Sequence, residues 1–467
     1  MANWQEIPIK NKIFQNVAES ALGGGLNATL ENGYINDVGG ISRFPRLKEY
    51  CSLSGGSPTF LEEHRGDLVA VSGSQVYRIN PDTPEVENVT EVAVSGSSRV
   101  IFAKTENELL AAAGRSIVKL SGDKSELLST EAPESTHVAY LGARVLAIEP
   151  RTGLFQYTPV GNYVAWDPLD TLSAEGKPDN ITGMLVTKFG ELILAGPDSI
   201  EQFDESPSGT RPYFKRWGLG TGLLCPYTLL SSDNRLWGVD QERSWVAFSA
   251  QVSNIDSEDI QNTLSSIDNI KDAFAVECFV QGQRFHILQF PFATNVYGTT
   301  GVTLLYDFIK QRWSSLYGWD VTKALPTRWD GYSVKQIGTK IFVGGTGKVY
   351  TLESYDGDQP QRMLWRSGHW SRPGNQPFRI EGLSLRVNRG ERAMNASIPQ
   401  LQIRANKDNQ GFGKWARASM SAPGKQYMTM NFPAMGTCDS VQFEIAVTDN
   451  GKIDITRLDM NVTNLRR

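Results

Sequence analysis

Short apolar segments recur through the middle of the chain. Each is bounded by a turn residue and followed by a second short segment that ends in an aromatic or branched side chain. Leu68–Val71 followed by Val76–Ile79 is one copy, and Leu192–Ala195 followed by Ile200–Phe203 is another. Apolar runs this short, with turn residues between them, predict β-hairpins. The seven copies begin at residues 66, 107, 142, 190, 234, 282 and 338.

The copies follow one another at intervals that average about 45 residues, and a period of about 40 to 50 residues with several strands per unit is typical of β-propellers. One small sheet cannot bury both of its faces, whereas sheets packed around an axis can. We therefore expect a β-propeller of six or seven blades over residues 51–355. A set of unrelated hairpins in sandwiches is the alternative interpretation.

The pattern changes on either side of this region. After residue 356 the propeller period stops, and alternating segments predict an antiparallel, sandwich-like β domain over residues 356–467. The predicted strands there are 383–387, 400–404, 427–432, 440–447 and 453–458. Residues 1–50 are irregular and punctuated by Gly23–Gly25 and Gly39–Gly40, which predicts an extended N-terminal arm lying on another surface. The expected fold class is all-β.

One helix interrupts the strands. Asp256–Asp259 offers an N-cap and an acidic first turn, and Ile260, Leu264 and Ile267 follow at the spacing of one helical face. A connecting helix that packs against a blade explains this pattern best.

Composition and charge narrow the possible functions. The chain has 467 residues, of which 40% are hydrophobic, so disorder is excluded as its main state. Asp and Glu outnumber Lys and Arg by 51 to 46, giving a formal net charge of −5. Tight neutralisation of a nucleic-acid backbone needs a basic excess, so we expect weak contact with DNA at most. No apolar stretch is long enough for a secretory signal or a membrane-spanning helix.

The residues that usually carry chemistry are few and scattered. The sequence contains no CxxC, HxxxH, HExxH or GxSxG motif, and we expect no catalytic, cofactor-binding or metal-binding residues and no cofactor. His286 lies inside an apolar strand and is interpreted as structural. The cysteines are far apart and are expected to be buried, reduced side chains: Cys51, Cys225, Cys278 and Cys438.

Three further patterns are better explained by folding than by chemistry. Gly344–Lys348 lacks the full spacing of a phosphate-binding loop and is expected to be a hairpin turn. The acid pair Glu62 and Glu63 is interpreted as part of a solvated face. Asp408–Trp415 resembles the Asp-box hairpin of sialidase propellers, but it occurs once and outside the repeats, so we interpret it as a turn that supports the fold.

Several blocks of sequence, in order, resemble one family: the tail nozzle or tail-hub proteins of short-tailed bacteriophages, also called packaged-DNA stabilisation proteins. The blocks run through residues 178–203, 272–313 and 399–449. The segment from Asn36 to Leu47 matches the N-terminal pattern of the family loosely, because Arg46 replaces a usual glycine.

The resemblance implies a structural virion protein and brings no catalytic residues. It implies a homohexameric ring below the portal and adaptor proteins of the tail, with an axial DNA channel that retains packaged DNA and allows its ejection. It further implies docking of tail fibres or tailspikes, a possible needle or plug protein, no membrane insertion, and assembly in the host bacterial cytoplasm. Six copies of an acidic chain would favour sliding of DNA over tight binding.

Two other classes of function remain open. A propeller enzyme acting on glycans, such as a sialidase or depolymerase, would need an arginine cluster or two carboxylates facing one central pocket. A generic propeller scaffold for protein interactions would resemble the common peptide-binding propellers, but their Gly-His and Trp-Asp signatures do not recur here.

Overall fold

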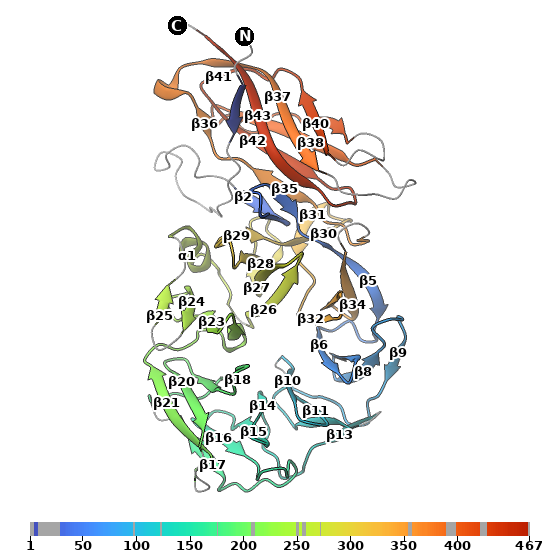
Figure 1. Ribbon diagram of the computed structural model, residues 1–467, viewed down its shortest axis with the longest axis vertical. Helices are drawn as coiled ribbons and strands as arrows, with labels where there is room; N and C mark the ends of the chain where they lie inside the picture. Colours follow the sequence, from blue (N-terminus) through green and yellow to red (C-terminus); the bar gives the residue numbers. More distant parts are fainter. Residues whose placement is uncertain are drawn as a thin grey trace.

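The computed structural model describes residues 4–7, 29–96, 99–121, 124–174, 176–206, 211–248, 252–254, 258–270, 272–353, 357–388, 398–420 and 427–465. Within these residues the protein consists mainly of β-strands. They form a ring of small sheets with a two-sheet sandwich beside it, and the chain passes from one to the other at a narrow junction (Figure 1).

Five blades follow one another along the chain as four-stranded antiparallel sheets. The first two are β6 (Thr59–His64), β7 (Asp67–Ser72), β8 (Gln75–Ile79) and β9 (Val86–Asn88), then β10 (Ile101–Lys104), β11 (Leu109–Ala112), β12 (Val118–Ser121) and β13 (Lys124–Leu127). The third and fourth are β14 (Val138–Leu141), β15 (Arg144–Ile148), β16 (Leu154–Tyr157) and β17 (Thr171–Ser173), then β18 (Gly183–Val186), β19 (Leu192–Ala195), β20 (Ile200–Glu205) and β21 (Tyr213–Leu219). The fifth is β22 (Leu230–Ser232), β23 (Arg235–Val239), β24 (Trp245–Phe248) and β25 (Val252–Asn254).

The last blade closes the ring with a strand from the other end of the chain. It contains β32 (Ser333–Ile337), β33 (Lys340–Gly344) and β34 (Lys348–Glu353), and its outer strand is β5 (Arg46–Ser52). In register, Ser52 lies opposite Lys348 and Arg46 opposite Glu353. The six self-contained blades confirm the predicted propeller.

The seventh position in the ring is occupied by a four-stranded meander, which is part of a larger sheet. Its strands are β26 (Phe274–Val280), β27 (Gln283–Thr294), β28 (Thr300–Asp307) and β29 (Arg312–Ser315). On the inner side of the ring, β26 contacts both β22 and β32. The seven hairpins predicted from the sequence are the second and third strands of these seven units.

An added hairpin explains the longest interval in the repeat. Between β29 and β32 the chain forms β30 (Tyr317–Asp320) and β31 (Leu325–Arg328), which pair with each other as a separate two-stranded sheet. This hairpin packs against β28. Its residues lie between the copies that begin at 282 and 338, where the sequence interval is 56 residues.

The predicted helix is present as α1 (Glu258–Ser265). Ile260, Leu264 and Ile267 are buried beside Trp237 and Trp245 of the fifth blade, as expected for a connecting helix. The proposed N-cap region at residues 256–257 lies outside the described residues.

The sandwich consists of two antiparallel sheets, and the predicted strands are present. One sheet contains β3 (Gly33–Ile35), β4 (Ile41–Arg43), β43 (Asp454–Asn464), β37 (Phe378–Asn388) and β40 (Tyr427–Phe432), with β1 (Trp4–Ile7) beside β43 and β41 (Gly436–Cys438) beside β37. The other contains β2 (Thr29–Glu31), β35 (Met363–Arg366), β42 (Ser440–Val447), β38 (Gln400–Lys407) and β39 (Ala416–Ser419), with β36 (Trp370–Ser371) beside β42.

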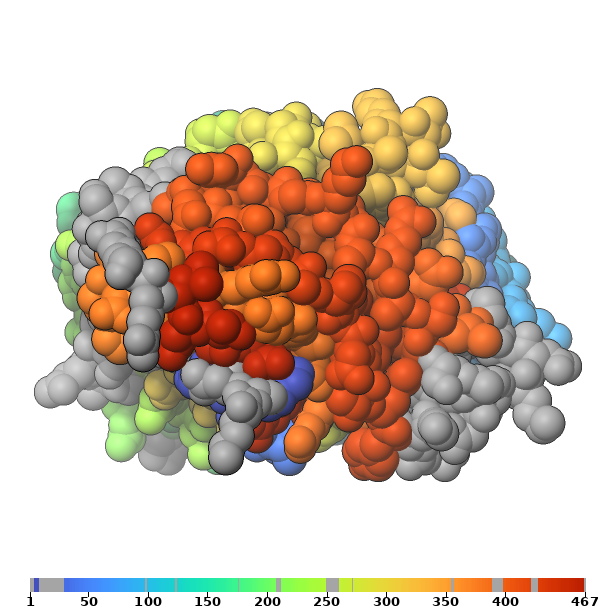
Figure 2. Space-filling model, turned by 90° about the horizontal axis from the view of Figure 1, so that it is seen from above, coloured from blue at the N-terminus to red at the C-terminus, as the bar shows by residue number. Residues whose placement is uncertain are grey.

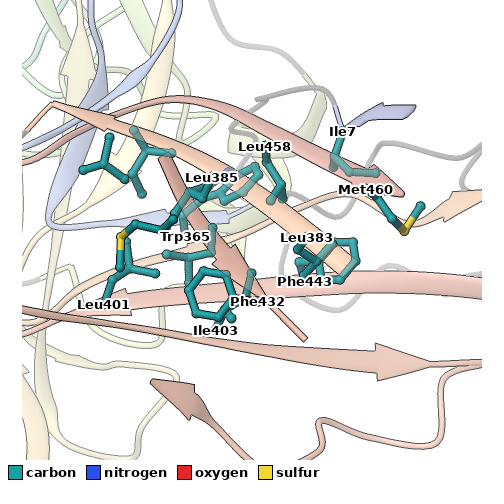
Figure 3. Close-up of a cluster of buried hydrophobic side chains, with 14 of the residues drawn as sticks. Ile7, Trp365, Leu383, Leu385, Leu401, Ile403, Phe432, Phe443, Leu458 and Met460 are labelled. Carbon is teal, nitrogen blue, oxygen red and sulfur yellow. The ribbon is translucent and has the colours of Figure 1, made fainter. Parts of the chain in front are cut away.

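Side chains from both sheets interleave between the layers (Figure 3). Leu383 and Leu385 of β37 face Ile403 of β38 and Phe443 of β42, and all four are essentially inaccessible to solvent. Burying one such side chain contributes about 1.5–3 kcal/mol, so this layer is a substantial core of its own. Ile7 of β1 belongs to the same core.

The described part of residues 1–50 therefore contributes strands to both the sandwich and the propeller. β1, β3 and β4 lie in one sheet of the sandwich, and β5 lies in the last blade. β2 pairs with β35 on one side and with β29 on the other, where Glu31 lies opposite Ser315. Through β2, the β26–β29 meander and one sheet of the sandwich become a single ten-stranded sheet.

Candidate functional site

The glycine-rich segment Gly344–Lys348 is the turn between β33 and β34, as predicted. The carboxylate of Asp330 braces this turn. It accepts hydrogen bonds from the Thr346 hydroxyl at 2.7 Å and from the Tyr350 hydroxyl at 3.0 Å. A carboxylate already seated in the turn would repel a phosphate, so the segment supports the fold.

The Asp408–Trp415 segment also has a structural role. The Asp408 carboxylate accepts backbone N–H groups of Asp439 and Ser440, both at 2.8 Å. The Trp415 ring is covered by the Arg404 guanidinium at 4.3 Å and the Arg362 guanidinium at 5.3 Å. The segment thus ties the β38–β39 connection to β42, and its aromatic ring is used for cation–π contacts.

The four cysteines are buried and unpaired in disulfides, as expected. Burial raises the pKa of each thiol to about 12, which keeps the thiols protonated and poorly reactive. His286 is also buried, and its Nε2 lies 2.9 Å from the Ser232 hydroxyl. Among the described residues, no group of three His, Cys, Asp or Glu side chains could hold a metal ion.

The acid pair at the end of β6 joins neighbouring blades instead of forming a solvated face alone. Lys104 of the second blade lies 3.1 Å from Glu62 and 2.6 Å from Glu63. Lys335 of the last blade also pairs with Glu62. These half-exposed ion pairs help to fix the first blade between its two neighbours.

The chemistry-bearing residues that the sequence did not reveal lie at the centre of the ring. Arg99 precedes β10 of the second blade, and its guanidinium lies 3.7 Å from the ring centre of Phe274 and 4.9 Å from that of Phe60. Its Nη2 donates to the carbonyl oxygen of Tyr332 at 2.5 Å. Arg99 therefore joins the second blade to β26, β6 and the segment that leads into β32.

A second contact joins the third blade to the fifth. His137, just before β14 of the third blade, stacks on Tyr227 with the ring centres 5.4 Å apart. Tyr227 lies in the short 3-10 turn Pro226–Thr228 that leads into β22 of the fifth blade. Burial lowers the pKa of His137 to about 4, so the imidazole is neutral at physiological pH.

These residues share a place in the repeat. Phe60, Arg99, His137 and Phe274 all lie at, or just before, the start of the innermost strand of a blade. The loops that enter these strands converge on one face of the propeller. The repeat alone could have indicated this position, but not which partners would meet across the axis.

Beside the Arg99 contacts lies a cavity of about 430 Å³. Its wall includes the aromatic rings of Phe60, Phe274 and Tyr332 and the guanidinium groups of Arg99 and Arg328. The acid Asp272 also lines it. A glycan-active propeller was expected to present an arginine cluster or two carboxylates in a central pocket, and this cavity has two arginines with one lining acid among the described residues.

The junction between propeller and sandwich is also polar and buried. Arg43 donates to the carbonyl oxygens of Gln361, at 2.6 Å, and Asp449. Arg46 donates to the carbonyl of Thr448 at 3.2 Å. Burial lowers the pKa of Arg43 to about 9. Two guanidinium groups in a cage of carbonyls fix the linker against both units.

The described residues contain no helix that is long and apolar enough to cross a membrane. No curated protein is similar enough to the chain to count as a match.

Several solved structures are similar to the chain. A catalytically inactive virginiamycin B lyase from Staphylococcus aureus, crystallised with quinupristin, is 9% identical with a TM-score of 0.44, and the match covers 66% of this chain and 99% of that one. The extracellular domain of a one component system from B. thetaiotaomicron is 10% identical with a TM-score of 0.41, covering 85% of this chain and 57% of that one. The extracellular domain of a hybrid two component system from B. thetaiotaomicron is 9% identical with a TM-score of 0.42. That match covers 82% of this chain and 49% of the other. These similarities are too distant to carry a functional argument.

A protein-family model also matches most of the chain. The model of the bacteriophage P22 Gp10 β-propeller covers residues 26–355, which include every strand from β2 to β34. It spans the strand that closes the ring, the seven repeats and the inserted hairpin. The chain therefore belongs to the bacteriophage P22 Gp10 β-propeller family of phage structural proteins that stabilise packaged DNA.

Proposed function

We propose that the chain forms a ring at the tail of a short-tailed phage virion, where it continues the DNA channel below the portal and adaptor proteins. In this position it retains packaged DNA and later allows its ejection. The observation that carries the proposal is the family match over the whole propeller, residues 26–355. A homohexamer is the assembly we expect, because identical subunits close a head-to-tail contact by forming a ring.

The charge of the chain supports a passage that does not hold DNA tightly. The formal net charge is −5 per copy. Proteins that bind the phosphate backbone release counterions by neutralising it with basic side chains, and a chain with more acids than bases cannot do so over a broad surface. A weakly repelling wall favours movement of DNA along the axis.

The centre of the propeller supports a channel between subunits and not through one subunit. Arg99 and the His137–Tyr227 pair reach across the inside of the ring. A DNA duplex is much wider than the space inside one propeller that these side-chain contacts bridge. In the proposed assembly, each propeller is a solid wall element, and DNA passes along the common axis of several copies.

Exposed apolar side chains support extensive contacts with other chains. Leu169 is 87% exposed, Val38 81% and Val321 71%. Apolar side chains at this exposure are common singly, but a protein that works inside an assembly gains by covering them. In Figure 2, the yellow to light-orange part of the chain, which includes the β27–β28 and β30–β31 hairpins, projects beyond the sandwich. We propose that adaptor, fibre or spike proteins and neighbouring copies cover such surfaces.

The proposal is tested by the assembly state of the purified chain with and without its adaptor protein. Native mass spectrometry and negative-stain electron microscopy should show a closed six-fold ring, at least once the adaptor is present. Each contact between copies should bury more than about 2,000 Å² in total, as in obligate assemblies. A chain that remains monomeric under both conditions, or that turns over a glycan, would overturn the proposal.

A further inference from the structure

The cavity of about 430 Å³ at the mouth of the propeller is not explained by ring assembly or by the passage of DNA. It lies where loops of the first, second and last blades meet the β26–β29 meander. Phe60 is the second residue of β6, Phe274 is the first residue of β26, and Phe292 lies near the end of β27. Aromatic walls with a few charged groups are typical of small-ligand sites.

Arg99 is the first unusual group in the wall. Its guanidinium has five N–H donors, of which the described residues take one, through the Tyr332 carbonyl. The faces of Phe274 and Phe60 cover it, and no carboxylate of the described residues forms an ion pair with it. Burial lowers the pKa of Arg99 to about 9, which reflects the cost of holding this cation away from water.

Arg328 brings a second positive charge to the same cavity. Its side chain is 14% exposed and lies 4.1 Å from the Tyr332 ring. It contacts Asp330 at 3.5 Å and Gln289 at 3.4 Å, which are long for charge-assisted bonds. Asp330 makes its short bond to Thr346 in the β33–β34 turn. Arg328 therefore keeps donor capacity for a ligand.

The remaining charged group in the wall is Asp272. The two guanidinium groups and the Asp272 carboxylate line the cavity, while Asp330 contacts Arg328 from outside the lining at 3.5 Å. With two acids beside the two cations, a singly charged anion suits the cavity better than a phosphate dianion. The rings of Phe60, Phe274 and Phe292 suit a flat apolar group attached to that anion. Arginine recognises a carboxylate with two parallel hydrogen bonds, a geometry that its planar donors match.

We propose that this cavity binds a carboxylate joined to an aromatic or similarly flat apolar group, with Arg99 and Arg328 holding the carboxylate. Two sources offer this chemistry: a small aromatic acid, or the terminal carboxylate of a partner polypeptide that ends in an aromatic residue. The site is a property of one subunit and is independent of whether the chain forms a ring.

The first test compares benzoate with benzamide, which has nearly the same shape and no charge. Isothermal titration of the purified chain should give a dissociation constant on the order of 1 mM for benzoate, as expected for a ligand of this size. Benzamide should bind at least tenfold more weakly. Equal binding of the two probes, or no binding of benzoate at 20-fold this concentration, would overturn the proposal.

Variants locate the binding. Arg99→Gln and Arg328→Gln should each weaken benzoate binding about tenfold or more. Arg115→Gln is the matched control, because Arg115 lines a neighbouring cavity, is 62% exposed and pairs with Glu134 at 3.1 Å. It should leave benzoate binding unchanged. If circular dichroism shows that Arg99→Gln does not fold, the Arg328→Gln variant alone tests whether benzoate binds in this cavity. Unchanged binding in a folded variant of either residue would contradict the assignment.

The second arm distinguishes the two sources. The dipeptide glycyl-phenylalanine should bind more tightly than benzoate if the cavity captures a chain terminus, and its C-terminal amide should bind at least tenfold more weakly than the acid. If benzoate binds and the dipeptide does not, the natural ligand is a small acid. These titrations use the isolated chain, so failure of the ring proposal would not affect them.

Discussion

The backbone N–H of Tyr317 donates to the carboxamide oxygen of Asn32 at 2.7 Å, although the two residues lie in distant parts of the sequence. The amide nitrogen of Asn32 in turn donates to the carbonyl of Arg362 at 2.7 Å. One buried side chain thus holds together the N-terminal segment, the start of the inserted β30–β31 hairpin and the linker into the sandwich. A single polar side chain, that of Asn32, therefore helps to fix the junction between the propeller and the sandwich.

Replacing Asn32 with alanine should destabilise the protein by about 2–4 kcal/mol, because buried backbone groups of Tyr317 and Arg362 lose their partners. Part of this cost is conformational, since Asn32 has a φ of 55° and alanine tolerates that region poorly. Urea unfolding followed by tryptophan fluorescence measures the change.

The Asn409→Ala variant separates the loss of hydrogen bonds from the conformational cost of a positive φ. Asn409 has a φ of 58° and is exposed, so its replacement should cost only the conformational part, about 1 kcal/mol. Similar losses for the two variants would show that the hydrogen bonds of Asn32 contribute little to the junction.

Much of the propeller could be predicted because its signal is local. A hairpin such as β7–β8 needs only two apolar runs and a turn, and seven copies at a roughly constant interval indicate a ring. The alternation along β37 and β38 likewise predicted a sandwich. The inserted β30–β31 hairpin appeared in the sequence only as a longer interval.

The N-terminal strands could not be predicted, because nothing local distinguishes them. β2, β3 and β4 have three residues each, which is too short for any periodicity. β2 pairs with β35 and β4 pairs with β43, and both of these partners lie more than 300 residues away in the sequence. The Arg99 cluster escaped prediction for the same reason, since its aromatic partners come from other blades and form no motif.

Glu444 offers a second test of a buried polar group. Its side chain is 1% exposed and pairs with Arg366 at 2.8 Å and with Arg404. Glu444→Ala should lower the free energy of unfolding by about 2–4 kcal/mol, because it leaves two cations side by side without their acid. Glu444→Gln should cost less, since the carboxamide oxygen can still accept a hydrogen bond from one of the two arginines.

The matched control for Glu444 is an exposed ion pair. Glu134 is 58% exposed and pairs with Arg115, so Glu134→Ala should change stability by less than about 1 kcal/mol. A Glu444→Ala variant that is as stable as Glu134→Ala would contradict the role assigned to the buried carboxylate.

Two buried histidines predict that the protein loses stability in acid. Burial lowers the pKa of His137 to about 4 and that of His286 to about 3. An unfolded histidine has a pKa of about 6.5, so the unfolded chain binds more protons below that pH. Stability should therefore fall as the pH is lowered from 7 towards 4, by at most about 1.4 kcal/mol per pH unit for each histidine.

The His137→Gln and His286→Gln variants isolate this effect. Buried carboxyl groups with a raised pKa, such as Glu31, Asp307 and Asp454, have the opposite pH dependence, so wild type and variants must be compared at each pH. The variants should show a shallower loss of stability between pH 6.5 and 4 in urea unfolding. Identical slopes would exclude the histidines as the cause.

The acidic chain should bind duplex DNA weakly. At 150 mM salt we expect a dissociation constant no tighter than about 10⁻⁴ M for a short labelled duplex, the weak end of non-specific binding. Fluorescence polarisation at 50 and 200 mM salt measures both affinity and salt dependence. Submicromolar binding that weakens steeply with salt would indicate a basic surface that binds the DNA backbone tightly. It would contradict the proposed channel, through which DNA moves with weak contact.

The most direct test of the proposed function is the nuclease-protected DNA content of particles made by the phage that encodes this chain, with and without a stop codon in its gene. Without the chain, heads should fill and then lose protected DNA, and supplying the chain in the host should restore retention. Stable, full and infectious particles that lack the chain would contradict the account.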